Sequence, residues 1–246
     1  MTVRLSRICR HPIKAHGRED LASVLLSAGA CLPGDRRWAV AHEAAKLVAG
    51  WNPCNNFHRG AKAPQLMAIE ATLAGDRVTL RHPNRPDLTF APDDPADLPA
   101  FLDWVAPISP TDRAQPQRIV SAGRGMTDSD FPSVSILSLA SLDALSERMG
   151  TPLSADRFRG NLWLSGVDAF AEFDWIGRDL QIGTAVLRIK ERITRCRATM
   201  ANPETGQVDA DTLGNLQAAY GHQDFGVFAE VIQGGKIALQ DEGILL

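Results

Sequence analysis

Short segments in which apolar and polar residues alternate recur along this 246-residue chain, and Gly, Pro, Asn or Asp ends most of them. Alternation with a period of two is typical of strands that bury one face, and those turn residues interrupt strands. The clearest case is a hairpin at 68–73 and 78–81, joined by a Gly-Asp turn, in which Val78 and Leu80 share one face. The pattern predicts an α+β fold that is rich in β-structure and barrel-like, with only a few short helices.

Helical periodicity is limited to short stretches. The best predicted helix covers 139–149, because Ser138 can cap its start and Gly150 can end it. The stretch 21–30 (LASVLLSAGA) has a helix-like composition but lies among strands, so both structures stay open. Shorter helices are expected at 98–105 and 213–220, and further strands at 3–5, 37–40, 88–90, 162–164, 179–193, 225–232 and 237–239.

The chain is long enough to bury two cores, and one segment suggests where they separate. The acidic, proline-rich stretch 91–99 (APDDPADLP) suits a boundary between two lobes. We therefore expect one domain at 1–95 and a second at 96–246.

Composition gives no reason to expect a nucleic-acid or membrane partner, because the net charge is −3 with 22% charged residues. The basic N-terminus lacks the apolar run of a signal peptide. The longest nearly apolar run, 21–32, is about half the length of a membrane span. A cytoplasmic location is therefore the expectation.

The usual catalytic and metal-binding signatures are absent from the sequence. Its four cysteines, Cys9, Cys31, Cys54 and Cys196, are far apart and form no C-x-x-C motif, which argues against zinc knuckles and a disulfide framework. No H-E-x-x-H, P-loop or G-x-S-x-G motif occurs either.

Cys196 nevertheless has an unusual setting, between Arg195 and Arg197 and shortly before an Asn-Pro-Glu-Thr-Gly turn. Positive charge lowers the pKa of a thiol and favours the thiolate, which is the form that attacks or binds metal. Inside a strand both arginines would point to the opposite face, so they help only if the strand ends before them. The residues alone indicate a reactive or metal-binding cysteine, or else a small buried residue near a strand end.

Two further clusters carry cations. In DRFRGNLWLSG, an extended backbone would place Arg157, Arg159 and Asn161 on one face, as a fork of donors suited to an anion. A solvated, salt-bridged face is the alternative. Lys14 and Arg36 lie in a third, weaker cluster near the N-terminus.

Two acidic residues near aromatic segments are less informative. His222 and Asp224 could form an acid–base pair, but without a nucleophile motif a polar turn is the favoured interpretation. Glu172 is a possible site carboxylate, although a surface or arginine-paired position is expected.

Taken in order, HPIKA, GDRRWAV, DRFRGNLWLSG, RITRCRATMANPETG and GHQDFGVFAEVIQGGKI resemble the MOSC family, named for the C-terminal domain of molybdenum cofactor sulfurase. The resemblance covers essentially the whole chain and is strongest in R-F-R-x-N and R-C-x-x-T…N-P-x-T-G. The first two clusters match the β-barrel domain that precedes MOSC in many members. The arrangement is similar to the branch that includes the mitochondrial amidoxime-reducing component and bacterial reductases of N-hydroxylated compounds.

The resemblance implies a molybdenum cofactor, molybdopterin with Mo, whose metal is bound by the catalytic thiolate of Cys196. It also implies contacts from six residues to the phosphate, pterin or neighbouring groups of that cofactor: Lys14, Arg36, Arg159, Asn161, Thr194 and Arg195. A soft thiolate suits a sulfur-ligated metal, and fixed cations suit a phosphate. Two departures are Ala15, which is often serine in the family, and the region 41–64, which is not a close match.

The implied function is a molybdenum-cofactor oxidoreductase that reduces N-hydroxylated small molecules with electrons from a separate electron-transfer protein or reductase. Two alternatives stay open. One is a sulfur carrier that bears a persulfide on Cys196, and the other is a cofactor-binding or storage module without turnover.

Overall fold

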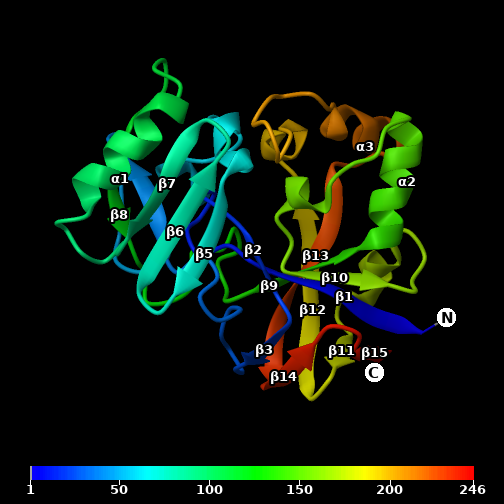
Figure 1. Ribbon diagram of the computed structural model, residues 1–246. Coiled ribbons are helices and arrows are strands. Elements are labelled where there is room, and N and C mark those ends of the chain that lie inside the picture. The colour runs from blue at the N-terminus through cyan, green and yellow to red at the C-terminus, as the bar shows by residue number, and fades with distance from the viewer. Residues whose placement is uncertain (1) are drawn as a thin grey trace.

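The computed structural model describes residues 2–246 and shows two lobes packed side by side (Figure 1). One lobe contains the β4–β8 part of the chain, and the other is a β-barrel that holds both the chain's beginning and its C-terminal half. The strands are β1 (Val3–Arg10), β2 (Glu19–Leu21), β3 (Ser23–Leu26), β4 (Ala39–His42), β5 (Glu70–Ala74), β6 (Arg77–His82), β7 (Arg85–Phe90), β8 (Pro116–Val120), β9 (Val134–Ser138), β10 (Leu162–Ser165), β11 (Asp179–Ile182), β12 (Ala185–Thr194), β13 (Asp224–Gln233), β14 (Gly235–Ala238) and β15 (Glu242–Leu245).

The barrel is closed by seven strands in the order β10-β9-β13-β12-β11-β15-β1, with β1 pairing back onto β10. In that closing pair Leu5 lies opposite Leu164 and Ile8 opposite Leu162. β9 and β10 run parallel, and the other neighbours in the barrel are antiparallel. The predicted β-rich, barrel-like fold is therefore confirmed.

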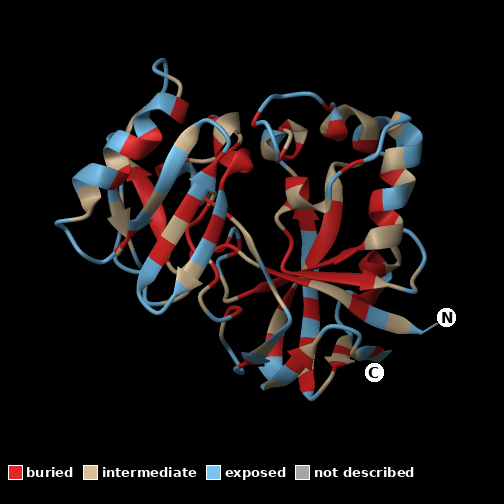
Figure 2. Ribbon diagram, in the orientation of Figure 1, coloured by how far each residue is buried: buried red, intermediate tan, exposed pale blue. Residues whose placement is uncertain are grey.

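Apolar alternation explains how the barrel is filled. Along β12, Leu187, Ile189 and Ile193 are buried while most of the residues between them are exposed. The inner faces of the other strands contribute the rest of one large core, and Figure 2 shows this burial along the barrel strands. Each buried aliphatic side chain of this kind contributes roughly 1.5–3 kcal/mol relative to an exposed one.

The helices are short and lie on the outside: α1 (Leu98–Val105), α2 (Leu139–Met149) and α3 (Thr212–Tyr220). α2 has the predicted limits, since the Ser138 hydroxyl accepts a hydrogen bond from the Ser141 amide and Gly150 adopts φ 66° after the last turn. The ambiguous stretch 21–30 contains β3 and the end of β2, and no helix. Within residues 2–246 no helix is both long and apolar enough to cross a membrane.

The other lobe is built on the predicted hairpin, extended to a three-stranded sheet β5-β6-β7. α1 packs Phe101 against Phe90, with ring centroids 5.1 Å apart. β8 pairs with β4 in the same lobe. A domain boundary at residues 95 and 96 stays a prediction, and β1 belongs to the barrel although it precedes this lobe in the sequence.

Candidate functional site

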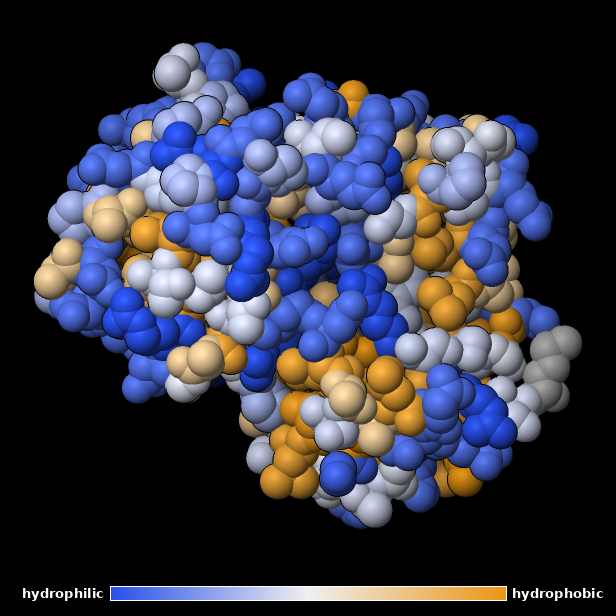
Figure 3. Space-filling model, viewed as in Figure 1, coloured by the Kyte–Doolittle hydropathy of each residue, from blue (hydrophilic) through white to orange (hydrophobic). Residues whose placement is uncertain are grey.

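A pocket of about 470 Å³ lies where the two lobes meet, and residues from both line it. Figure 3 shows a hydrophilic recess in this part of the surface. The pocket brings together all seven residues that the sequence singled out for a site: Lys14, Arg36, Arg159, Asn161, Thr194, Arg195 and Cys196.

Cys196 is an exposed, free thiol at the edge of this pocket. β12 ends at Thr194, and a short 3₁₀ turn, η6 (Arg197–Met200), follows directly after the cysteine. Cys196 itself has extended backbone angles, and its carbonyl accepts hydrogen bonds from Thr199. The strand has therefore ended before the thiol, which is the condition under which neighbouring arginines can influence it.

The two flanking arginines differ. The Arg195 side chain turns inward and donates to the carbonyl oxygens of Phe225 and Phe158, the latter at 2.9 Å. Burial lowers the pKa of Arg195 to about 10, and the nearby Cys196 thiolate would raise it. Arg197 is exposed and does not line the pocket. Arg195 is therefore the flanking cation that belongs to the site.

A second group of cations forms the pocket floor. Lys14, only 4% exposed, donates to the Met126 carbonyl at 2.8 Å and to Asp128 at 2.5 Å. Arg36 forms an ion pair with Asp35 and donates to the Arg159 carbonyl at 3.1 Å. These contacts hold both cations at fixed positions beside the pocket.

Arg159 has no carboxylate partner among the ion pairs of residues 2–246, and its guanidinium donates to the Gly17 carbonyl at 3.1 Å. Burial and the positive charge of Arg36 together lower the pKa of Arg159 to about 9. Two guanidinium groups thus lie near each other, and the Asp35 carboxylate pairs with that of Arg36. An anion bound here would relieve that repulsion.

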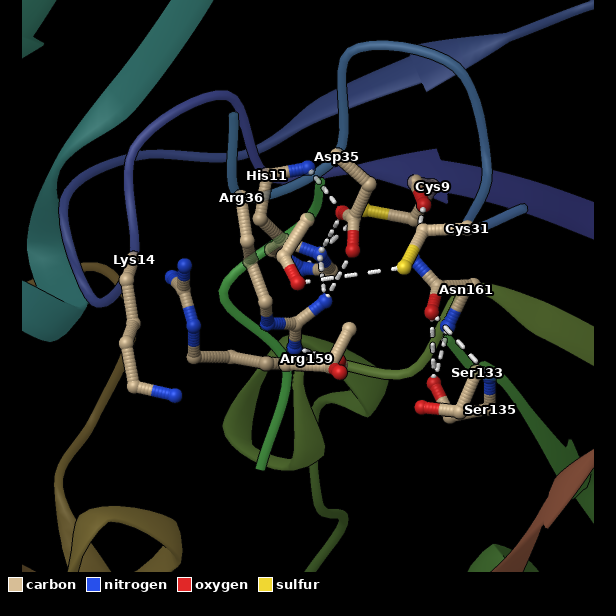
Figure 4. Close-up of polar contacts among 12 residues, drawn as sticks. Cys9, His11, Lys14, Cys31, Asp35, Arg36, Ser133, Ser135, Arg159 and Asn161 are labelled. Carbon is tan, nitrogen blue, oxygen red and sulfur yellow. Dashed lines mark hydrogen bonds and ion pairs between the residues drawn. The ribbon is translucent and has the colours of Figure 1, made fainter. Parts of the chain in front are cut away.

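A buried polar network supports Arg36 from behind (Figure 4). Asp35 accepts hydrogen bonds from the His11 amide at 2.8 Å and from the His11 ring at 3.1 Å. Burial lowers the pKa of His11 to about 3, and the charges of Arg159 and Arg36 act in the same direction. His11 is therefore neutral, and Asp35 keeps its charge for Arg36.

Backbone strain is concentrated at the same place. Five non-glycine residues within 2–246 have positive φ, and three of them line this pocket: Ala15 at 63°, Arg36 at 48° and Arg159 at 48°. Such conformations cost on the order of 1–3 kcal/mol each and tend to occur at functional sites. Arg36 and Arg159, which both line the pocket, are thus both held in the left-handed region.

Asn161 and Thr194 line the pocket while making hydrogen bonds within the protein. The Asn161 amide oxygen accepts from the Ser135 amide and hydroxyl, and its nitrogen donates to the Cys9 carbonyl at 3.1 Å (Figure 4). The Thr194 hydroxyl donates to Asp224 at 2.6 Å. Asn161 therefore connects β1, β9 and the start of β10 beneath the site.

Two sequence expectations need correction, and a third, on His222, agrees with the structure. The segment of Arg157 and Arg159 is not extended, since η4 (Ala155–Phe158) coils it, and Arg157 instead pairs with Asp209 at 2.7 Å. Glu172 is neither on the surface nor arginine-paired: it is 1% exposed and accepts from the Ser141 hydroxyl. His222 has the favoured turn role, accepting from the Asp224 amide.

Sequence reasoning did not identify Asp35, His11 or Asp128 as parts of this arrangement. Asp35 stands beside Arg36 in the sequence, so that charge pair could have been found. The other two are far from their partners along the chain, and no local pattern marks them.

The donors present fit a group that carries both a phosphate and a sulfur-bound metal. The cations of the floor exceed their carboxylate partners, which suits a phosphate. No cluster of three or more His, Cys, Asp or Glu that could hold a metal exists within residues 2–246. The Cys196 thiol is a soft donor that suits a sulfur-ligated metal.

Fold and pocket together define a β-barrel protein in which several cations and an exposed cysteine line one pocket. The MOSC domain family model matches residues 125–242, and the model of the MOSC N-terminal beta barrel domain matches residues 2–101. The chain belongs to the MOSC family.

Curated relatives extend over most of the chain at low identity. Mitochondrial amidoxime-reducing component 1 of Mus musculus is 25% identical, covering 86% of this chain and 72% of the relative. The Danio rerio protein of the same name is 23% identical over 82% of this chain and 70% of its own. Among solved structures, the YuaD protein from Bacillus subtilis aligns with 100% of this chain and 96% of its own, with TM-score 0.48 and 12% identity.

Proposed function

We propose that this protein is a molybdenum-cofactor-dependent oxidoreductase that reduces N-hydroxylated or related N-oxygenated small molecules. The observation that carries the proposal is the meeting of the exposed Cys196 thiol with the partly buried cations Arg36 and Arg159 in one pocket. Family membership and the names of the amidoxime-reducing relatives support it.

Cys196 would hold the metal through its thiolate. Lys14, Arg36 and Arg159 would hold the phosphate, because they are fixed cations with fewer carboxylates than charges. Thr194, the last residue of β12, and Arg195, which follows it, would act close to the metal. Arg195 would keep positive charge beside the thiolate, and Thr194 would act through its backbone. Asn161 would support this arrangement from below.

The bound cofactor supplies the two-electron reduction of the N–O bond. Two electrons and two protons convert an N–OH group to N–H with release of water, so an electron donor is required. We propose a separate electron-transfer protein or reductase as that donor. The protein itself orients the substrate in the pocket and holds the charges of the cofactor in place.

Location and the alternative function stay predictions. The sequence favours the cytoplasm, whereas the names of the relatives contain the word mitochondrial. The exposed, free thiol of Cys196 also suits a sulfur carrier, in which it would bear a persulfide.

Metal analysis of protein made in a host that synthesises the cofactor tests the proposal. We expect molybdenum near one per chain in the wild type and in Cys31→Ala, and a large loss in Cys196→Ser. Loaded wild type supplied with a reductant should reduce an amidoxime, and Cys196→Ser should not. Wild type that carries a persulfide on Cys196 but no molybdenum would refute the proposal in favour of the sulfur carrier.

A further inference from the structure

One wall of the pocket comes from the lobe opposite the barrel and has no part in the expected cofactor contacts. It consists of Cys54, Arg59, Gly60, Ala61 and Met67. These residues lie in or just after the region where the sequence departs most from the family pattern. What this wall binds is therefore a property of this chain.

Arg59 is the cation on this wall, and its charge is not neutralised within the protein. It is half-buried, and its guanidinium donates to the Cys54 sulfur at 3.1 Å. None of the ion pairs found within residues 2–246 includes it, whereas Lys14 pairs with Asp128 and Arg36 with Asp35. A neutral sulfur is a weak acceptor, so this contact orients the guanidinium without satisfying its charge.

The wall is pressed against the segment that carries Cys196. A Cβ placed on Gly60 would lie 3.3 Å from the Ala198 Cβ and 2.7 Å from the Met67 sulfur. Ala198 belongs to η6, which begins directly after Cys196. Gly60 thus allows the backbone beside Arg59 to approach the loop of the reactive thiol closely.

The backbone on this side is also fixed by buried histidines. His58, adjacent to Arg59, contacts His16 through ring nitrogens 3.2 Å apart, and the other His16 ring nitrogen contacts the Lys14 carbonyl at 2.8 Å. These histidine contacts connect the segment that carries Arg59 to the segment that carries Lys14. Both cations line the pocket although they are far apart in the sequence. A rigid backbone makes Arg59 a positioned donor rather than a loose surface charge.

We propose that Arg59 is a substrate-binding residue and that the preferred substrates are N-hydroxylated compounds that carry a carboxylate. A planar guanidinium binds a carboxylate by donating two parallel hydrogen bonds. The contact with Cys54 fixes the orientation of the Arg59 guanidinium. Ala61 and Met67 line the pocket beside the Arg59 guanidinium. The small apolar part of the substrate, between its carboxylate and its N–OH group, would lie against them. This inference rests on the proposed function and specifies its substrate class.

The test compares two amidoximes that differ in charge, benzamidoxime and 4-carboxybenzamidoxime, with cofactor-loaded protein. For the carboxylate compound, Arg59→Gln should raise KM about ten- to hundredfold with little change in kcat, because a hydrogen-bonded charge pair is lost. KM for the neutral compound should stay within about twofold. Arg59→Lys should show a smaller KM increase.

The matched control is Lys62→Gln, which removes an exposed cation three residues away that does not line the pocket. It should leave both KM values unchanged. Equal effects of Arg59→Gln on the two compounds, or no effect on either, would overturn the proposal.

A binding measurement separates this inference from the proposed function. Calorimetric titration of each loaded protein with 4-carboxybenzamidoxime should show weaker binding to Arg59→Gln, with the far-UV spectrum and thermal midpoint confirming that the variant is folded. If neither amidoxime is reduced but binding of 4-carboxybenzamidoxime still depends on Arg59, the proposed reductase activity is refuted and the carboxylate subsite is supported. Equal affinity in wild type and variant would refute the subsite whatever the activity.

Discussion

The Arg36 guanidinium donates to the Arg159 carbonyl at 3.1 Å, and both residues adopt the same left-handed backbone conformation. One arginine comes from the segment before β4 and the other from the turn before β10. The contact places two guanidinium groups at the floor of one pocket, with Asp35 as the carboxylate that balances one of them. The local charge surplus, together with the strain, is what an anion would stabilise.

Arg159→Gln should therefore separate stability from cofactor binding. Without cofactor, the variant should unfold at a higher temperature than the wild type, by roughly 2–4 °C if about 1 kcal/mol of repulsion is removed. The molybdenum content of the same variant should fall, because a phosphate contact is lost. Differential scanning calorimetry and metal analysis measure the two effects, with the exposed Arg113→Gln as the control. A cofactor-free variant that is less stable than the wild type would contradict this account of Arg159.

Asp35→Asn should destabilise the protein strongly. Asp35 is buried and accepts two hydrogen bonds from His11 and one from Arg36. Its loss removes the carboxylate that pairs with Arg36, whose side chain is only 11% exposed. Breaking a buried pair of this kind costs about 3–5 kcal/mol, measurable by urea unfolding. Asp76→Asn, which removes one of the two exposed carboxylate partners of Arg37, should cost less than about 1 kcal/mol. Similar losses of unfolding free energy in Asp35→Asn and Asp76→Asn would contradict the argument that the burial of Asp35 makes its ion pair important for stability.

Glu172 should make stability depend on pH in a defined direction. Burial raises the pKa of Glu172 from 4.5 to about 7, so the folded state holds its proton more tightly than the unfolded state. The stabilisation is complete below about pH 4.5 and is lost as the pH rises through 7. Unfolding free energies of wild type and Glu172→Gln should thus diverge by about 3 kcal/mol in favour of the variant by about pH 8.

The exposed Glu147→Gln on α2 is the control for that series and should follow the wild type at every pH. A difference between Glu172→Gln and the wild type that does not vary with pH would mean that folding leaves the pKa of Glu172 unchanged.

Ala15→Gly should be tolerated or stabilising, contrary to the usual effect of glycine. Ala15 has φ 63°, where glycine relieves strain that offsets the entropy it adds to the unfolded chain. We expect a change between zero and about 1 kcal/mol of added stability in urea unfolding. Ala144→Gly, inside α2, should instead lose about 1 kcal/mol. A loss at Ala15 as large as at Ala144 would refute the strain argument.

The sequence by itself determined the local elements and the candidate residues. α2 has its predicted limits because a capping serine and a left-handed glycine stand directly at its two ends in the sequence. The β5–β6 hairpin follows from apolar alternation on both sides of one turn. The ordered clusters also singled out seven residues that line one pocket, although their roles stay predictions. These features depend on neighbouring residues, which a single sequence displays directly.

Tertiary structure alone decided the closure of the barrel and the environment of each charge. Pairing of β1 with β10 joins segments more than 150 residues apart, and no local pattern specifies such a partner. The extended face expected for Arg157 and Arg159 was wrong because η4 coils there, and Glu172 is buried because Ser141 on α2 meets it. Burial and the distance between charges set a pKa and an ion pair, and both quantities exist only once the chain has folded.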